Sequence, residues 1–316
     1  MPADLPALGR LYEAVKGRPR PESVTGHRLF DTPWGDSVAL IAVDGDVCVS
    51  MAVYWPVAMR VGDEVVPGAQ GMEAVTHPDY RNRPRLFITL AKQGRDLALE
   101  RMQLMYTFPN VRSIKLTKHV GATYLGEVGG WGIDLERRRL RLPRRARWSD
   151  DADPTIDELA QLAARAHAQR DLVRIDKSAD WLSWRYSDAT CENYAWVVER
   201  DESGSLTAAA LLGERDPASW GADFAGIYRI HELFALGDEA ARSVLGRSVE
   251  RVRSVGARKL DVLVKDPMLE EAVAASGFRL EGRHPMTAIS NPTKAVGFDT
   301  YDFDCWRVIT GDHDFF

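Results

Sequence analysis

The sequence predicts two α/β domains of one fold in tandem, each built on a mixed α+β sheet. The chain has 316 residues, enough for two domains of roughly 150 residues each. Both halves show the same order of elements: a strand, a long helix, a strand, a short helix, a glycine and a strand. In the first half 37 residues separate Pro84 from Gly121, and in the second 38 separate Glu239 from Gly277. This repeated order at nearly equal spacing indicates two copies of one fold.

The first strands come from alternating apolar runs. Residues 37–58 read as two β-runs joined at Asp44-Gly45, a turn-forming pair. Residues 61–70 are expected to form a further turn, and residues 71–76 a short strand.

A long helix follows over residues 84–102, where the apolar side chains fall on one helical stripe. Pro84 suits the first helical position, because its missing N–H costs nothing there. Residues 104–108 form an apolar strand, and a short helix over about 111–119 stops at Gly121, before a further strand.

The second half repeats these elements. Residues 228–236 read as a strand, and residues 239–255 as a helix with its apolar positions in register. A strand at 259–264 and a helix at 267–275 follow, and Gly277 precedes the last strand.

The junction between the halves interrupts the periodic pattern, which places an N-terminal domain at 1–148 and a C-terminal domain at 149–316. An arginine run at 137–147 marks this junction. One interpretation is a solvated face paired with the aspartates that follow. The other is a docking site for an anionic partner, such as a carrier protein or tRNA.

Composition indicates a globular protein and excludes several other classes. Hydrophobic residues make up 45% and charged residues 28% of the chain, and the net charge is −5. A globular protein without a general attraction for nucleic acid or anionic membranes is expected. We find no apolar run long enough to span a membrane and no secretory signal, so a cytoplasmic location is expected. Three distant cysteines, without metal-ligand spacing, predict reduced thiols and no metal site.

Three stretches carry a family resemblance: GMEAVTHPDYRNRPRLF (71–87), YTFPN (106–110) and SIKLTKHVGATYLGEV (113–128). They resemble a bacterial branch of the GNAT superfamily of N-acetyltransferases, whose members often carry a second, diverged copy of the domain. WLSWRYSDATCENY (181–194) looks like the opening of that second copy, and CWRVITGDHDFF (305–316) resembles the way such chains end.

The resemblance implies that an acyl-CoA donor lies along the strand 71–76. Strand amides would bind the pantetheine arm, and the following turn and helix N-terminus would hold the pyrophosphate. The implied donor-binding residues are Ala74, Val75, Thr76, Arg81, Arg83, Arg85, Leu86, Phe87, Asn110 and Ser113.

The sequence departs from the family pattern at the phosphate turn. The family has glycine there, because the backbone must approach the phosphates closely. This chain has Arg81-Asn82-Arg83-Pro84-Arg85. Either the three arginines compensate by binding phosphate, or the turn has lost its affinity for CoA. In the second half Asp238 and Glu239 would repel a pyrophosphate, so that domain is expected to bind no CoA and to shape the acceptor pocket or a dimer.

Four residues are candidates for acid–base chemistry. Glu73 and His77 could take the proton of the amine, and Tyr106 or Tyr124 could protonate the leaving thiolate. Period-two alternation places Glu73 on one face with Val75, opposite Met72, Ala74 and Thr76. Each of the four also has a structural interpretation, as a strand, turn or core residue.

The leading hypothesis is therefore an acyltransferase that moves an acyl group, such as acetyl, from acyl-CoA to a small-molecule amine. That acceptor could be an amino sugar or a biosynthetic intermediate, and the protein a monomer or homodimer. A second hypothesis keeps the fold but uses an aminoacyl-tRNA or acyl-carrier-protein donor. A third is a catalytically inactive protein that holds a ligand in the same cleft.

Overall fold

The computed structural model describes residues 4–18, 20–110, 113–135, 153–168, 172–187, 194–215, 224–294 and 299–313. The predicted domain boundary at 148/149, the arginine run at 137–147 and Cys191 lie outside these residues.

The first half holds four α-helices and five strands within the described residues. They are α1 (Leu5–Lys16), α2 (Glu22–Phe30), α3 (Pro84–Arg101), α4 (Ile114–Thr117), β1 (Val38–Asp44), β2 (Val47–Val61), β3 (Glu64–Thr76), β4 (Leu104–Thr107) and β5 (Thr123–Asp134).

The second half supplies the remaining strands and helices. They are α5 (Ile156–Ala166), α6 (Ala179–Arg185), α8 (Asp238–Ser254), α9 (Pro267–Ala275), β6 (Val173–Ile175), β7 (Tyr194–Arg200), β8 (Leu206–Glu214), β9 (Ile227–Ala235), β10 (Lys259–Lys265), β11 (Arg279–Ser290) and β12 (Val308–Ile309).

The predicted repeat is confirmed. The order β3-α3-β4-α4-glycine-β5 in the first half matches β9-α8-β10-α9-glycine-β11 in the second. Both glycines adopt a left-handed backbone, with φ of 85° at Gly121 and 90° at Gly277. Glycine adopts such a φ without the steric cost that a Cβ imposes, which is why it ends both short helices.

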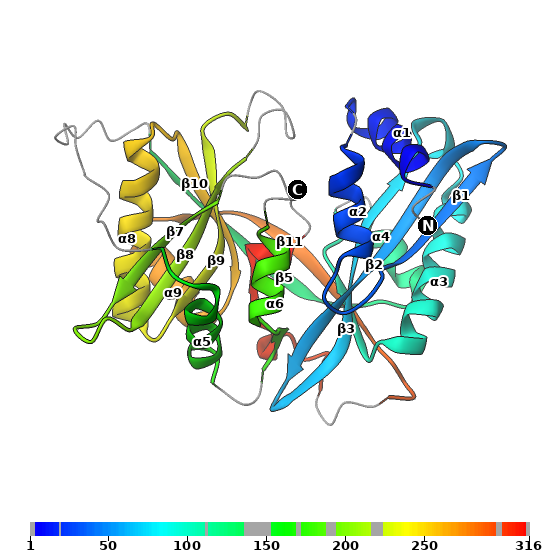
Figure 1. The fold of residues 1–316 in the computed structure, drawn as a ribbon. Helices are drawn as coiled ribbons and strands as arrows, with labels where there is room; N and C mark the ends of the chain where they lie inside the picture. Colours follow the sequence, from blue (N-terminus) through cyan, green and yellow to red (C-terminus); the bar gives the residue numbers. More distant parts are fainter. Residues whose placement is uncertain are drawn as a thin grey trace.

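One continuous mixed sheet joins the two halves (Figure 1). Its described strands follow the order β1-β2-β3-β4-β11-β5-β10-β9-β8-β7, with β6 paired to β2 and β12 to β10. Strand β11, from the second half, lies between β4 and β5, where Ala288 pairs with Tyr106. Strand β5, from the first half, pairs in turn with β10. Each half therefore completes its sheet with a strand of the other.

Helices cover both faces of the sheet in the first half. Helix α3 packs on one face, where Ala98 clusters with Tyr54 and Met105. Helices α1 and α2 lie on the other face, where Leu11 belongs to the same core as Met51 (Figure 1). The sequence had not predicted α1 or α2.

Strand β3 differs from its prediction in two ways. It begins at Glu64, so the expected turn at 61–70 is confined to the residues around Gly62. The predicted alternation is also wrong, because Glu73 has a φ of 48° and the pairing of β3 with β2 shifts register there. This β-bulge brings Met72 and Val75 into the same core cluster on the α1 side.

None of the helices in the described part of the chain is both long enough and apolar enough to cross a membrane.

Candidate functional site

Strands β3 and β4 run parallel for four residues and then separate. Residues Gly68–Gly71 pair with Leu104–Thr107, and no described strand pairs with this edge of β3 beyond Gly71. The other edge stays bonded to β2 as far as Thr76. The bulge at Glu73 and the Pro109 that follows β4 lie on the two sides of this gap. Main-chain groups of residues 72–76 therefore face an opening in the sheet instead of a neighbouring strand.

A cavity of about 370 Å³ occupies this opening. Its lining includes residues packed on the α3 side of the sheet, such as Tyr54 and Ala91, and residues on the α1 side, such as Tyr12 and Arg20. The cavity thus passes through the sheet and is bounded by residues of both layers. A molecule bound in the cavity can therefore contact residues of either layer.

Glu73 lines the cavity as a buried, doubly paired carboxylate. Its Oε1 accepts hydrogen bonds from Arg20 at 2.6 Å and from Arg28 at 2.9 Å. Burial alone raises the pKa of Glu73, but the charges of Arg20 and Arg28, together with a hydrogen bond from Tyr12, outweigh it and lower the pKa below its ordinary value. The carboxylate is therefore held ionised, which makes it a weak base.

Five of the residues predicted to bind the donor line the cavity: Ala74, Val75, Phe87, Asn110 and Ser113. Asn110 also bonds the residues at the start of the short helix α4: its Oδ1 accepts from the Ser113 amide at 3.0 Å and its carbonyl from the Ile114 amide at 2.9 Å.

The other five do not line it; they lie at the end of β3 and the start of α3. Thr76 bonds the hydroxyl of Ser50, and Arg81 donates to the Thr76 carbonyl at 3.3 Å. The Arg83 guanidinium stacks over the ring of Tyr80, Arg85 is exposed, and Leu86 is half-buried. Apart from Thr76, this group belongs to the predicted phosphate turn and the first residues of α3.

Of the four acid–base candidates, Tyr106 lies in the cavity with Glu73. Its hydroxyl donates to the carbonyl of Asp312 at 3.1 Å. His77 lies outside the cavity lining and accepts from the Asp79 amide at the turn after β3. Tyr124 is also outside the lining and is 52% exposed.

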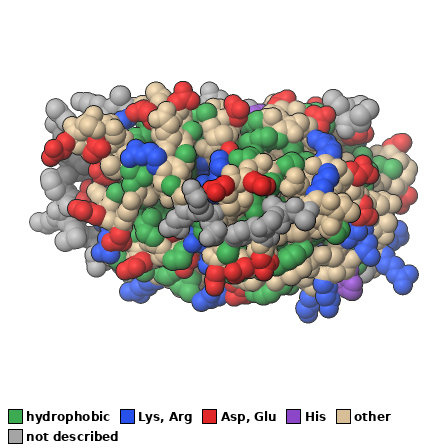
Figure 2. Space-filling model, turned by 90° about the horizontal axis from the view of Figure 1, so that it is seen from below, with side chains coloured by type: hydrophobic (Ala, Val, Ile, Leu, Met, Phe, Trp, Pro, Cys, Tyr) green, Lys and Arg blue, Asp and Glu red, His purple; other side chains and the backbone are tan. Residues whose placement is uncertain are grey.

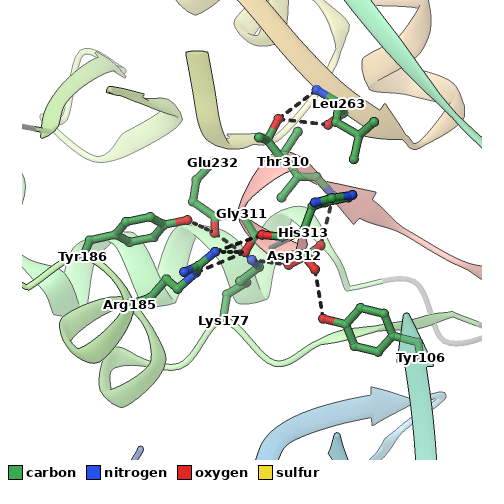
Figure 3. Close-up of polar contacts among 11 residues, drawn as sticks. Tyr106, Lys177, Arg185, Tyr186, Glu232, Leu263, Thr310, Gly311, Asp312 and His313 are labelled. Atoms are coloured by element: carbon green, nitrogen blue, oxygen red, sulfur yellow. Dashed lines mark hydrogen bonds and ion pairs between the residues drawn. The ribbon is translucent and has the colours of Figure 1, made fainter. Parts of the chain in front are cut away.

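The equivalent gap in the second half is closed by the chain itself. Strands β9 and β10 pair over Ile227–Ile230 and Lys259–Val262 and then separate, as β3 and β4 do. Past this point strand β12 replaces β9 as the neighbour of β10, and Ile309 pairs with Val264. The other edge of β10 is paired with β5. The Thr310 hydroxyl also accepts from the Leu263 amide at 2.7 Å (Figure 3).

Buried polar contacts hold this C-terminal segment, residues 306–313, in place (Figure 3). Lys177 donates to both Glu232 and Asp312. Arg185 donates to the carbonyl of Gly311 at 3.2 Å and to that of His313 at 3.0 Å. Since a buried charge is costly to leave unpaired, these contacts fix the position of the segment.

The C-terminal segment carries His313 from the closed gap of the second half into the cavity of the first. His313 lines that cavity, and its ring lies 4.5 Å from that of Phe108, centroid to centroid. Burial holds the pKa of His313 well below its ordinary value, and the nearby His284, Arg229 and Arg185 lower it further. The imidazole is therefore neutral at neutral pH. Sequence reasoning missed this residue, which the fold alone brings to the site.

Replacing Gly311 by alanine is expected to lower the free energy of unfolding by about 1–3 kcal/mol, as overpacking in a core does. A Cβ at this position would overlap the Tyr186 hydroxyl and the Glu232 carboxylate, which are hydrogen-bonded to each other. The control is Gly246→Ala in helix α8, where a Cβ meets nothing within 4 Å and about 0.5–1 kcal/mol of added stability is expected. Denaturant unfolding measures both variants. A Gly311→Ala protein as stable as the parent would contradict the close packing of this segment.

No protein-family model matches the chain, and neither does any curated protein sequence. Solved structures, in contrast, share its fold. A probable N-acyltransferase from Enterococcus faecalis V583 superposes with a TM-score of 0.62 at 16% identity, over 92% of this chain and 71% of that one. A GCN5-related N-acetyltransferase from Anabaena variabilis ATCC 29413 gives 0.61 at 12% identity, over 92% and 71%.

A tandem GNAT protein from the clavulanic acid biosynthesis pathway is similar over almost the full length of both chains. It superposes with a TM-score of 0.58 at 13% identity, over 92% of this chain and 95% of that one. The chain therefore has a GNAT fold in a tandem arrangement, as the sequence predicted.

Proposed function

We propose that this protein is an N-acyltransferase that moves an acyl group, such as acetyl, from acyl-CoA to the amine of a small molecule. The observation that carries the proposal is the open gap between β3 and β4, with a cavity that passes through the sheet. The similarity to GNAT structures supports it, because the proteins described above include N-acetyltransferases.

The donor lies on the α3 side in this proposal. Main-chain groups of residues 72–76 bind the pantetheine arm, with Asn110 and Ser113 across the gap. The N-terminus of α3 carries a partial positive charge that favours phosphate, and Arg81, Arg83 and Arg85 are close to it in the sequence. These arginines take the place of the glycine-containing turn expected from the family.

The acceptor enters from the α1 side, where the reaction takes place. The amine nitrogen attacks the thioester carbonyl, a C–N bond forms, and the C–S bond breaks to release the thiolate. His313 takes the proton of the amine, and Tyr106 gives a proton to the thiolate and recovers one from the His313 imidazolium. The products are an amide and free CoA, and both side chains return to their starting states.

Glu73 fits a positioning role better than that of the base. Two arginines hold its carboxylate ionised, so it has little tendency to take a proton. His313 faces the same cavity and is neutral, so its imidazole has an acceptor nitrogen. Its lowered pKa makes the imidazolium a strong acid, so it keeps the proton only until Tyr106 takes it. His77 and Tyr124 have no part in this proposal, because neither lines the cavity.

Acetyl-CoA is expected to bind with one molecule per chain, because the second gap is filled by β12. At about 100 times its dissociation constant it would stabilise the protein by about 2.7 kcal/mol. Isothermal titration calorimetry measures the number of molecules bound per chain, and a thermal shift measures the stabilisation. The exposed Ala74 lines the cavity, so Ala74→Trp should block binding, whereas Val65→Trp, exposed elsewhere on β3, should not.

A parent protein that binds no acetyl-CoA at millimolar concentration would contradict the CoA donor. Two molecules per chain would contradict the closed second gap. If acetyl-CoA does not bind, the binding assay is repeated with an acylated carrier protein and with an aminoacyl-tRNA to test the other donors.

A further inference from the structure

A second cavity, of about 400 Å³, lies where the two halves meet and shares no lining residue with the first. The turn between β2 and β3, at the lower edge of Figure 1, forms one wall with Arg60 and Asp63. The end of α5, strand β6 and the residues after it form the other wall, with His167, Arg174 and Lys177. Nothing in the proposed acyl transfer uses this cavity.

Two arginines stand directly opposite each other in its wall. Strand β6 pairs antiparallel with β2, and the register places Arg174 across from Arg60. Like charges in directly opposite positions destabilise a strand pair. Asp176 neutralises Arg60 through a contact of 3.0 Å. Among the described residues, no carboxylate forms such a contact with Arg174.

Arg174 is a buried cation with unused hydrogen-bonding capacity. The residue is 7% exposed, and no described residue accepts a hydrogen bond from its buried Nη1. Burial, and next the charge of Arg60, lower the pKa of Arg174 to about 10, although Asp176 acts in the opposite direction. Burying a charge without a bonded partner is costly, so this arrangement favours an anion that completes it.

His167, also in the cavity wall, lies near several cations. Burial lowers the pKa of His167 to about 3, and the charges of Arg174, Lys177 and Arg307 add to the effect. Lys177 is itself bonded to Glu232 and Asp312.

The face seen from below has acidic and basic side chains interspersed over its described part (Figure 2). An attraction for anions here therefore comes from the cavity and not from a broad basic surface.

We propose that this cavity binds the phosphate or carboxylate group of a small molecule between Arg60 and Arg174. Guanidinium groups bind both oxyanions through paired hydrogen bonds, and the Ser178 hydroxyl also lines the cavity. The bound anion would join β2 of the first half to β6 of the second, and so stabilise the contact between the halves. The site is independent of the proposed acyl transfer.

Inorganic phosphate and citrate are the two probes, each titrated at constant ionic strength against sodium chloride. At least one is expected to raise the melting temperature and to bind in calorimetry. Arg174→Met should weaken that binding by about tenfold or more, since a charged hydrogen-bond donor is lost. Without the probe, the same variant should be as stable as the parent or more so, because an unpaired buried charge is removed.

The matched control is Arg279→Met, which removes an exposed arginine from β11 and should leave probe binding unchanged. If phosphate binds at the start of α3 instead, the Arg174→Met protein will bind it as tightly as the parent does. Unchanged binding by this variant would overturn the proposal. Equal shifts with chloride, or no binding of either probe, would also overturn it. A response to citrate alone would assign the site to carboxylates, and a response to phosphate alone would assign it to phosphates.

Discussion

Glu73→Gln is expected to lower the free energy of unfolding by about 3–5 kcal/mol, the usual cost of removing one partner from a buried ion pair. The Glu73 side chain is 2% exposed and neutralises Arg28, which is 4% exposed, as well as Arg20. Glutamine keeps the size of the side chain but removes the negative charge that Glu73 places beside these two cations. Denaturant unfolding at neutral pH measures the loss.

The control for this variant is Glu64→Gln, at the exposed start of the same strand, which should change stability by no more than about 0.5 kcal/mol. The pH dependence gives an independent check. Because the pKa of Glu73 in the folded protein lies below its ordinary value of 4.5, its stabilisation is fully present above that pH and is lost as the pH falls through the folded value. The difference in stability between parent and variant should therefore shrink below pH 4.5. A small effect that is independent of pH would show that the two arginines do not depend on this carboxylate.

His313→Ala is expected to slow acyl transfer by about 10²–10⁴-fold, the range for losing a general base, while acetyl-CoA binds as tightly as to the parent. The imidazole lines the cavity, and the residue is held there by contacts to its main chain, including the bond from Arg185 to its carbonyl. Thiol release from acetyl-CoA with a panel of amines measures the rate.

Chemical rescue with imidazole distinguishes a catalytic role of His313 from a structural one. Removing the His313 side chain enlarges the open cavity, so added imidazole should restore part of the lost rate. His119→Ala, which removes an exposed histidine from the turn before β5, serves as the control and should keep the parent rate. Full activity of His313→Ala would exclude the proposed role. Loss of acetyl-CoA binding along with the rate would indicate a collapsed site instead.

Much of the fold could be predicted because its signals are local. The helix at 84–101 follows from one apolar stripe and a proline at its first position, and Gly121 and Gly277 follow from turns that need a left-handed backbone. Part of the cavity was also predictable. Ala74, Val75 and Asn110 were implied as donor-binding residues by the family resemblance, and all three line the cavity.

The remaining site residues come from segments whose contacts the sequence does not indicate. Arg20 and Arg28 approach Glu73 from the N-terminal helices, and His313 approaches from the other end of the chain. The face of Glu73 was predicted from simple alternation, which the bulge at φ 48° interrupts. One residue in a left-handed conformation changes which side chains share a face, and hydrophobic periodicity does not reveal it.

Propensity and periodicity act over a few neighbouring residues, so they were enough to predict the repeated elements and their order, but not α1 or α2. Packing across the whole chain selected which strands became neighbours: β11 between β4 and β5, and β12 in the gap beside β9. An apolar strand can pair with many partners, and the choice depends on packing between residues far apart in the chain. That choice left one gap open and closed the other, so two copies of one fold present only one open gap among the described residues.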